Sequence, residues 1–478
     1  MEQKTEHYNL LIEDWIPVLW NNGEFSRVGI GEAFRKASRI RQIAASNPMD
    51  RVSIVRFLLA LLYWCKGNVT DEGDAIPKDS FPADWFLKLE KNQDYFNLLG
   101  DGKRFYQDRC AERKRPSTDL IQEIPTGNNF WHFWHSTDKI DGLCPACCAM
   151  GLLRLPLFSV SGLPDLMSGI NGIPPVYVLR WGGSLFDTIC ANWVKHMQIG
   201  DPAWLRPTIQ KNQEDEPTLL TGLTLPSRRV WLHGPSGPPG TCGCCGGKET
   251  FLIQTCEFQT AGKQENDLWN DPHVVYLDET PRKSLRASDL TAARKFRMDR
   301  PWPNLFSRIT QTGKFVSREK STSILVVGFA TDKAKNVDVW ERTIDLLPSE
   351  SIQANATSFL RHWHNEGGRL ENETASILRS GAMGTSTIAT IRPNIENTVS
   401  AKAQELVCGT YGWEQAAGEY CTMAHAIAKS LSPGFTTAAL QRRQKIACVG
   451  PNMRLTTGLD DELSRTEEER NGRNGSVH

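Results

Sequence analysis

The chain has 478 residues, more than one ordinary hydrophobic core holds, so its length predicts two domains. Its hydrophobic content of 40% and charged content of 23% are those of a globular protein, and its formal net charge is zero. A protein that binds nucleic acid on its own is usually basic overall, so this balance argues against that class but is compatible with a local basic patch. The longest apolar run, residues 57–65, is too short to cross a bilayer, and the first seven residues are polar. We therefore expect a cytoplasmic protein without membrane contact.

The first half of the chain alternates between strand and helix patterns. Residues 9–18 have strand composition, and Pro17 indicates an edge or a strand end. Asn47-Pro48 is typical of a helix start. The apolar residues that follow it at helical spacing, Ile54, Phe57, Leu58, Leu61 and Leu62, predict a core helix.

The second half changes character along its length. Residues 282–320 are basic, with 11 Lys or Arg against three acids. Residues 324–329 predict a buried strand that leads into a polar loop, residues 330–336. Helical patterns dominate beyond about residue 350. The predicted fold class is therefore α+β, with a mixed α/β N-terminal domain at 1–355 and a C-terminal helical bundle at 356–478 that ends in a disordered tail.

Thirteen cysteines fall in clusters, and two pairs have C-x-x-C spacing: Cys144-Pro-Ala-Cys147 and Cys242-Gly-Cys-Cys245. This spacing lets one turn aim two thiolates at one ion, and two such pairs complete a closed tetrahedral zinc site. In a chain without an export signal, clustered cysteines favour a metal over disulfides. We predict structural Zn²⁺ at this site. Cys148 and Cys244 are alternative ligands, although neither keeps the paired spacing.

The enzyme motifs that the chain approaches are all incomplete. A catalytic zinc would need three protein ligands and a water, and a zinc deaminase would need H-x-E before P-C-x-x-C. His364-Asn-Glu366 follows both cysteine pairs, so its order is wrong. Gly246-Gly-Lys248 resembles the end of a phosphate-binding loop, but that motif needs glycine where Cys242 stands. No catalytic residue is assigned; free thiols are the other alternative to structural zinc.

With these features in place, the chain resembles the CasA family, the large subunit of the type I-E CRISPR Cascade. The blocks that carry the resemblance are, in order, residues 9–18, Gly127-Asn-Asn with Phe133 and His135, residues 143–153, residues 168–175, residues 242–246, Asp267-Leu-Trp269 and residues 328–336. Their order and spacing match the family over residues 9 to about 345. The resemblance implies an N-terminal α/β domain followed by a helical bundle.

The resemblance also implies a function. A subunit of this family sits near the 5′ end of the guide RNA, probes duplex DNA from the minor groove for a short motif beside the target, and wedges the strands apart. The minor groove presents a degenerate pattern of donors and acceptors, which suits a protein that accepts several related motifs. Base pairing with the guide RNA supplies the sequence specificity. The implied partners are the backbone, 5′-handle and small subunits around the guide RNA, target double-stranded DNA and a helicase-nuclease.

Carried over residue by residue, the loop 331–336 corresponds to the wedge, with Asn336 as its amide side chain and Lys333 and Lys335 beside it for phosphates. An ordinary solvated β-to-helix loop is the alternative for these residues. The residues that correspond to the loop that docks on the guide RNA or a neighbouring subunit are Asn128, Asn129, Phe133 and His135. An aromatic core cluster is the alternative there.

The sequence departs from the family pattern in three places. The glycine-rich DNA loop after the first cysteine block keeps only Gly162. The family's motif-sensing lysine falls on Thr260, with Lys263 as its substitute three residues later. Residues 360–478 are only loosely similar to the family. The first departure concerns the approach of the backbone to the minor groove, the second the residue that senses the motif, and the third the similarity of the C-terminal bundle to that of the family.

The basic stretch 282–320 favours nucleic-acid contact without reference to the family, with a solvated surface as its alternative. We therefore predict a non-enzymatic DNA-recognition subunit. Its rivals are a zinc-containing nucleic-acid enzyme, such as a nuclease, whose catalytic residues are unidentified, and a scaffold without DNA contact of its own.

Overall fold

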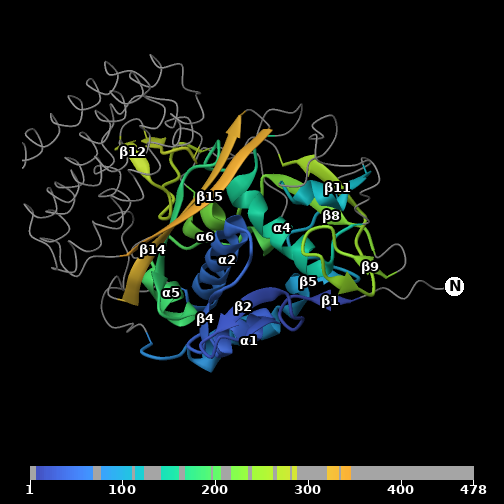
Figure 1. Ribbon diagram of the computed structural model, residues 1–478, viewed down its shortest axis with the longest axis horizontal. Coiled ribbons are helices and arrows are strands. Elements are labelled where there is room, and N and C mark those ends of the chain that lie inside the picture. Colours follow the sequence, from blue (N-terminus) through green and yellow to red (C-terminus); the bar gives the residue numbers. More distant parts are fainter. Residues whose placement is uncertain are drawn as a thin grey trace, which may run out of the picture. The chain divides into compact units, whose positions relative to one another are not determined.

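A computed structural model of the chain describes residues 7–67, 77–109, 114–122, 142–160, 167–194, 198–205, 217–234, 239–261, 266–279, 282–287, 320–332 and 335–345. Apart from Asp345, these residues belong to one compact unit (Figure 1). The predicted helical bundle at 356–478, and the domain boundary before it, lie outside the described residues.

Helices and strands alternate along the described chain. The α-helices are α1 (Ile30–Arg35), α2 (Pro48–Lys66), α3 (Leu87–Lys91), α4 (Pro145–Phe158), α5 (Leu185–Ala191) and α6 (Leu219–Thr224). Short 3₁₀ helices are η1 (Ala83–Phe86), η2 (Gln93–Phe96), η3 (Ser117–Leu120) and η5 (Ala203–Leu205). The strands are β1 (Tyr8–Asn9), β2 (Ile16–Trp20), β3 (Phe25–Val28), β4 (Ile40–Ile43), β5 (Asn97–Leu99), β6 (Lys114–Pro116), β7 (Tyr177–Gly182), β8 (Arg228–Leu232), β9 (Gly240–Thr241), β10 (Lys248–Glu249), β11 (Thr255–Thr260), β12 (Tyr276–Glu279), β13 (Arg282–Ser284), β14 (Ser321–Asp332) and β15 (Lys335–Asp345). The mixed α/β character predicted for this region is confirmed.

The described strands form three three-stranded sheets and three two-stranded pairs. Their strand orders are β3-β2-β4, β6-β11-β8 and β15-β14-β7, and the pairs β1-β5, β9-β10 and β12-β13 complete the pairing. The β2–β3, β2–β4, β11–β6, β11–β8 and β14–β7 ladders are antiparallel. Two of these antiparallel ladders, β11–β6 and β14–β7, pair strands that are more than one hundred residues apart in sequence.

Helix α2 is the centre of the core. Figure 1 shows it surrounded by α4, α5, α6 and strand β14, all of which contact it. The Oδ1 atom of Asn47 accepts a hydrogen bond from the Met49 amide at 2.8 Å, and Pro48 occupies the first helical position. Residues 52–64 are buried without interruption, as expected of a helix that is packed on every side. The helix start and the core helix predicted from the sequence are both confirmed.

A polar pair joins α2 to α4 inside this core. The Arg154 guanidinium donates to both carboxylate oxygens of Asp50, at 2.6 and 2.7 Å. Both side chains are almost fully buried. A buried charge is tolerated only with a partner of this kind, so the pair fixes the register between the two helices.

The strand predicted over residues 9–18 is divided in two. Strand β1 ends at Asn9 and β2 begins at Ile16, with turns between them. Leu10 and Trp15 are both fully buried, and an odd separation of five residues would have placed them on opposite faces of one strand. The intervening turn lets both side chains enter the core.

Pro17 lies near a strand end, one of the two positions predicted for it. It is the second residue of β2, as a strand-end position requires, but β2 is the central strand of its sheet. The Pro17 carbonyl accepts from the Ala44 amide at 2.9 Å, so the residue still contributes to the pairing that its missing N–H could not supply. Of the two alternatives predicted from Pro17, an edge or a strand end, the structure supports the strand end.

The buried strand predicted at 324–329 is confirmed as part of β14, whereas the polar loop predicted at 330–336 is mostly strand. Strand β14 runs to Asp332 and β15 begins at Lys335. Only two residues separate these hydrogen-bonded strands, so the connection is a tight hairpin rather than a β-to-helix loop. The polar residues 330–336 therefore flank a hairpin tip. In the described part of the chain, no helix combines the length and the apolar character that a membrane crossing needs.

Candidate functional site

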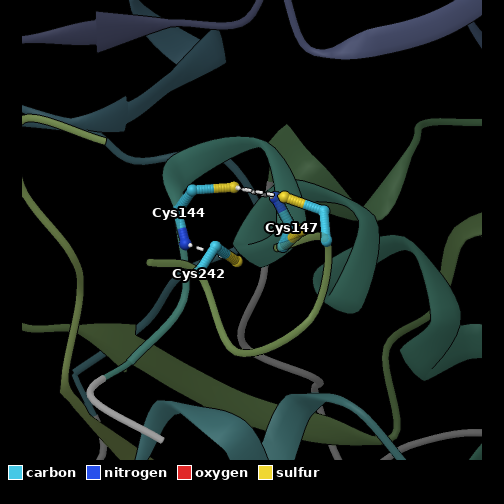
Figure 2. A group of neighbouring side chains, drawn as sticks. Cys144, Cys147 and Cys242 are labelled. Carbon is cyan, nitrogen blue, oxygen red and sulfur yellow. Dashed lines mark hydrogen bonds between the residues drawn. The ribbon is translucent and has the colours of Figure 1, made fainter. Parts of the chain in front are cut away.

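The four cysteines of the two C-x-x-C pairs meet at one point. Cys144 is the N-cap of α4, and its Sγ accepts a hydrogen bond from the Cys147 amide in the first turn. Cys242 and Cys245 lie in the turn between β9 and β10. Figure 2 shows Cys144, Cys147 and Cys242 directed toward one another. The sequence predicted that these residues would come together, and the structure brings them together.

Backbone contacts lock the two cysteine turns to each other. The Cys242 Sγ accepts from the Cys144 amide at 3.2 Å, and the Gly243 amide donates to the Gly142 carbonyl at 3.0 Å. Gly246 has a φ of +71°, which permits the tight turn after the second pair. Amide donors aimed at sulfur are typical of a thiolate site, because they stabilise negative charge on the ligand.

The sulfur positions fit a tetrahedral zinc ion. All four Sγ atoms lie within 4.8 Å of one another, and the Cys144 and Cys245 Sγ atoms are 3.8 Å apart. Tetrahedral Zn–S bonds place sulfurs about 3.8 Å apart, whereas a disulfide needs about 2.05 Å. The cysteines are free thiols, so the group has the spacing of a metal site and not of two disulfides.

The charges in the cluster also suit a cation. Side-chain hydrogen bonds within the cluster lower the pKa of Cys242, and a hydrogen bond from Cys147 lowers the pKa of Cys245 to about 5. The same contacts raise the pKa of Cys147, because packed thiols cannot all ionise unaided. A divalent cation removes this conflict by stabilising every thiolate at once.

The two alternative ligands lie outside the converging group. Cys148 is fully buried in α4 and Cys244 is exposed, and neither belongs to the group whose ligand atoms converge. The Cys244 amide instead donates to the Cys242 Sγ at 3.5 Å. The paired spacing therefore identified the four cysteines that converge.

Sequence reasoning missed one residue of this site, Arg27 on β3. Burial opposes its charge, but its hydrogen bond to Cys245 and the charges of nearby cysteines raise its pKa. A four-thiolate zinc site carries a net charge of about −2, which a neighbouring guanidinium offsets. No sequence feature could have identified Arg27, because it lies more than two hundred residues before Cys245 and in an unrelated strand.

The opposite end of α4 gathers the ends of the segments that the resemblance assigns to DNA. Segment 161–166, which contains Gly162, begins three residues after α4 ends at Phe158. The Phe158 ring contacts the Phe329 ring of β14 edge-on, with centroids 6.2 Å apart. Phe329 lies three residues before β14 ends at the 331–336 hairpin. Two of the predicted DNA segments thus start from one aromatic contact.

The third segment, 262–265, which contains Lys263, starts and ends in the same area. The Ala261 amide donates to the Ser227 carbonyl at 3.1 Å, and the Ser227 hydroxyl donates to the Leu155 carbonyl of α4 at 2.9 Å. At the other end, the Asn266 amide donates to the Ile170 carbonyl at 3.3 Å. The residues flanking all three segments are therefore linked to the C-terminal end of α4 or to the chain just after it.

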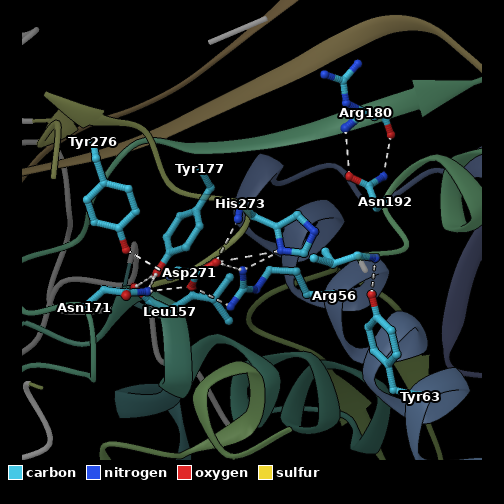
Figure 3. A network of polar contacts seen from close by, with 11 residues as sticks. Arg56, Tyr63, Leu157, Asn171, Tyr177, Arg180, Asn192, Asp271, His273 and Tyr276 are labelled. Atoms are coloured by element: carbon cyan, nitrogen blue, oxygen red, sulfur yellow. Dashed lines mark hydrogen bonds and ion pairs between the residues drawn. The ribbon is translucent and has the colours of Figure 1, made fainter. Parts of the chain in front are cut away.

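A buried polar network fastens the chain that follows these segments to α2 (Figure 3). The Arg56 guanidinium donates to both carboxylate oxygens of Asp271, at 2.6 and 2.9 Å, and Asn171 donates to the same carboxylate at 2.9 Å. Burial and the charge of Arg56 lower the pKa of His273 to about 3, so its ring is neutral and its Nδ1 accepts from Arg56 at 2.9 Å. The network therefore fixes residues 171 and 271 on one helix.

The structure describes only some of the remaining predicted site residues. Lys335 and Asn336 are the first two residues of β15, next to the hairpin connection. The predicted residues that lie outside the described part of the chain are Asn128, Asn129, Phe133, His135, Gly162, Lys263 and Lys333. Most of the basic stretch 282–320 also lies outside it.

Comparison with known proteins gives the family. The profile of the CRISPR-associated protein Cse1 family matches residues 9–445. A CasA/Cse1 protein of Thermus thermophilus is 30% identical over 218 residues, a match that spans 43% of this chain and 43% of the relative's length.

Solved structures share the fold at lower identity. Thermus thermophilus CasA matches with a TM-score of 0.67 and 19% identity, covering 95% of this chain and 100% of that one. Thermobifida fusca Cse1 matches with a TM-score of 0.67 and 15% identity, covering 95% and 98%. A chain of a CRISPR RNA-guided surveillance complex matches with a TM-score of 0.69 and 12% identity, covering 94% and 99%.

The family profile covers most of the chain, and the cysteine cluster and mixed α/β fold agree with the resemblance found in the sequence. The chain therefore belongs to the Cse1 (CasA) family, the large-subunit family of the type I-E Cascade surveillance complex.

Proposed function

We propose that this chain is the non-catalytic large subunit of a cytoplasmic, guide-RNA surveillance complex. It reads a short motif in duplex DNA beside the target and starts strand separation there. Its partners are the guide-RNA-bound subunits, the target duplex and a helicase-nuclease that acts after recognition. Relatives in a surveillance complex, one of them captured before nicking, support this assembly.

The observation that carries the proposal is the gathering of flanking residues around one end of α4. Segment 161–166, segment 262–265 and hairpin 331–336 are far apart in sequence, yet their flanking residues are linked through Leu155, Phe158 and Ile170. A motif of a few base pairs covers a short length of duplex, so the residues that contact it must lie close together. This arrangement supports a single DNA-contact region made from three parts of the chain.

The cysteine site supports the proposal from the other end of the same helix. Helix α4 has 14 residues, which gives it a length of about 21 Å. We propose that structural Zn²⁺ bound by Cys144, Cys147, Cys242 and Cys245 fixes the start of α4. The bound ion would supply no chemistry to DNA, because four thiolates leave no open coordination position. Its contribution is to hold in place the helix whose far end carries the DNA segments.

The hairpin between β14 and β15 is proposed as the wedge. An ion pair between Arg51 of α2 and Glu341 ties β15 to the central helix, and Trp340 packs directly over Gly328 of the neighbouring strand. A hairpin braced in this way can bear against base pairs without folding back. Lys335 and Asn336 stand at its tip and are proposed to contact phosphate and base.

The test changes Lys335 and Asn336 to Ala in the assembled complex. We expect duplex binding to weaken about tenfold, from the loss of one phosphate and one base contact, and binding to a target already opened at the motif to change by less than about twofold. Arg342→Ala, an exposed cation farther along β15, is the matched control and should leave both affinities unchanged. Equal losses on duplex and pre-opened targets would contradict strand opening, and metal-dependent cleavage by the isolated chain would favour a nuclease instead.

A further inference from the structure

The sheet β6-β11-β8 has a core face and an outward face. Val230 and Leu232 of β8 are fully buried, so they lie on the core face. Because side chains alternate along a strand, Trp231 belongs to the opposite face, together with its direct partner Glu257 on β11. Glu257 also pairs with the exposed Lys114 of β6. The three strands therefore each contribute one of these residues to a row across the outward face.

The chain segment 104–109 lies along the β8 edge of this sheet. The Asp108 amide donates to the Val230 carbonyl at 2.9 Å. The Arg104 guanidinium donates to the Leu232 carbonyl at 2.8 Å. Two contacts to alternate carbonyls of one strand hold the segment beside β8, so its side chains start from fixed positions next to Trp231.

The indole ring of Trp231 carries two guanidinium groups. The Cζ atom of Arg104 lies 4.3 Å from the ring centroid, and that of Arg109 lies 4.7 Å from it. At these distances the ring attracts a guanidinium and helps to hold it in place. Planar guanidinium groups and aromatic rings are also the surfaces on which proteins stack the unpaired bases of RNA. Arg109 is exposed, so such a base can reach it.

Positive charge exceeds negative charge on this face. One of its carboxylates, Asp108, already forms an ion pair with Arg229 at 3.0 Å. The other, Glu257, lies 3.9 Å from the Nε2 atom of His233. These two carboxylates stand among four cations: Arg104, Arg109, Lys114 and Arg229. A net positive face on a chain whose formal net charge is zero favours an anionic partner.

The pKa of His233 is consistent with this excess. Burial lowers the pKa, and Glu257 opposes that effect. The charges of Lys114, Arg109 and Arg104 lower the pKa further. Three cations that act on one imidazole lie close together, and closely spaced cations are what a phosphate chain binds, because it releases counterions on contact.

The chemistry of the face suits single-stranded RNA better than a duplex. The bases of a duplex are stacked inside it, whereas a single strand can place a base on the guanidinium over Trp231 and its phosphates on the neighbouring cations. The Glu257 carboxylate repels phosphate and accepts hydrogen bonds only. The 2′-hydroxyl of RNA supplies a donor at every nucleotide, and DNA has no such group.

We propose that the outward face of the β6-β11-β8 sheet, around Trp231, is a contact surface for single-stranded RNA, and that the guide RNA is the strand it meets in the assembled complex. Arg109 stacks on a base, Lys114 binds phosphate and Glu257 accepts from a 2′-hydroxyl. None of these residues is among those that the resemblance assigns to guide-RNA docking. The choice of the guide RNA rests on the proposed function, whereas the surface itself does not.

The experiment uses the full chain with Arg109→Gln and Lys114→Gln combined, both at exposed positions. Binding of a single-stranded RNA of about 12 nucleotides is measured by fluorescence anisotropy at several salt concentrations. We expect the affinity at low salt to fall about tenfold, and the slope of log K against log salt to become shallower by about 1.4, the value for two lost phosphate contacts of a single strand.

The matched control combines Arg41→Gln with Lys91→Gln, two exposed cations on β4 and α3. It changes the net charge equally and should leave the affinity within about twofold and the slope unchanged. Arg109→Lys keeps the charge and loses the planar group, so it should weaken RNA binding several-fold without changing the slope. Wild-type affinity and slope in the double variant, or equal losses in the control pair, would overturn the surface.

DNA of the same sequence tests the choice of RNA. We expect the wild-type chain to bind the DNA strand several-fold more weakly, because the strand lacks 2′-hydroxyls. Equal affinity for both strands would overturn the RNA assignment. In the complex assembled without this chain, the double variant should bind several-fold more weakly than the wild-type chain, and equal binding would overturn the guide RNA as the strand.

The outcomes separate this inference from the proposed function. If the double variant binds RNA like wild type while the wild-type complex still prefers a motif in duplex DNA, the surface is overturned and the function stands. If the double variant loses RNA binding as expected but the wild-type complex shows no motif preference, the DNA-reading function is overturned and the RNA surface stands.

Discussion

At the scale of single residues, local spacing carried the most information. The C-x-x-C pairs identified the four converging thiols because a turn of fixed length sets the direction of both side chains. Long-range partners had no such pattern. Arg27 beside Cys245, and Asp271 beside Arg56, are each more than two hundred residues from their partners, so neither contact could be predicted from the sequence.

The metal site yields a prediction with a neighbouring control. Cys245→Ser removes one of the four proposed zinc ligands, so zinc affinity should fall about 100-fold or more, because the loss of a ligand costs at least as much as the loss of an outer contact. Cys244→Ser changes the adjacent thiol, which lies outside the group, and should keep about one zinc per chain. Zinc is measured by atomic emission on protein equilibrated with a competing chelator. Equal zinc loss in both variants would refute the assignment of ligands.

The buried network predicts a pH dependence of stability. The pKa of His273 is lowered from its ordinary 6.5 to about 3, so unfolded protein binds a proton in this range that folded protein does not. The contribution of neutral His273 to the free energy of unfolding is therefore fully present above pH 6.5. As the pH falls toward 3, the free energy of unfolding decreases by about 1.4 kcal/mol per pH unit. Although burial opposes it, Arg56 holds the pKa of Asp271 below its ordinary value, which extends the loss to lower pH.

The check is urea unfolding between pH 7 and pH 4. His273→Asn keeps an acceptor for Arg56 and removes the titrating group, so the slope of unfolding free energy against pH should become shallower than in wild type. An unchanged slope in the variant would show that His273 does not contribute.

At the scale of elements, the sequence predicted what local chemistry determines. Helix α2 was predicted because a helix cap at Asn47-Pro48 is followed directly by an apolar run at helical spacing. Strand β14 was predicted for its apolar composition, but the hairpin after it was not. The polar residues 330–336 resemble a loop in sequence. Most of them are strand because β14 and β15 pair with each other. Pro17 left an edge and a strand end open, and only tertiary pairing, which places its strand in the centre of a sheet, decides for the strand end.

The hairpin proposed as the wedge gives a prediction at this scale. A Cβ on Gly328 would lie 2.2 Å from the Trp340 ring, so Gly328→Val must push the two strands out of their present packing. We expect the variant to bind duplex several-fold less well while binding pre-opened target within about twofold, since a shifted hairpin affects only strand opening. Gly234→Val is the control, because a side chain there enters open space among the described residues. Wild-type duplex binding by Gly328→Val would argue against a braced wedge.

At the scale of the whole molecule, the family was recognisable and the arrangement was not. Ordered sequence blocks indicated the CasA family, which the profile match over residues 9–445 confirms. No block indicated that the flanking residues of three distant segments meet around one end of α4, because that follows from contacts such as Phe158–Phe329 and Ser227–Leu155. These contacts depend on the complete fold, with the cysteine site at one end of the helix and the proposed DNA region at the other.

The most direct test of the account is a duplex-binding measurement on the guide-RNA complex assembled with and without this chain. Targets share one guide-matched sequence and differ only in the neighbouring motif bases. We expect tight, motif-dependent duplex binding only when the chain is present, with affinity for pre-opened targets much less dependent on the chain. Duplex binding that is equally tight and equally motif-dependent without the chain would contradict the DNA-reading role at its centre.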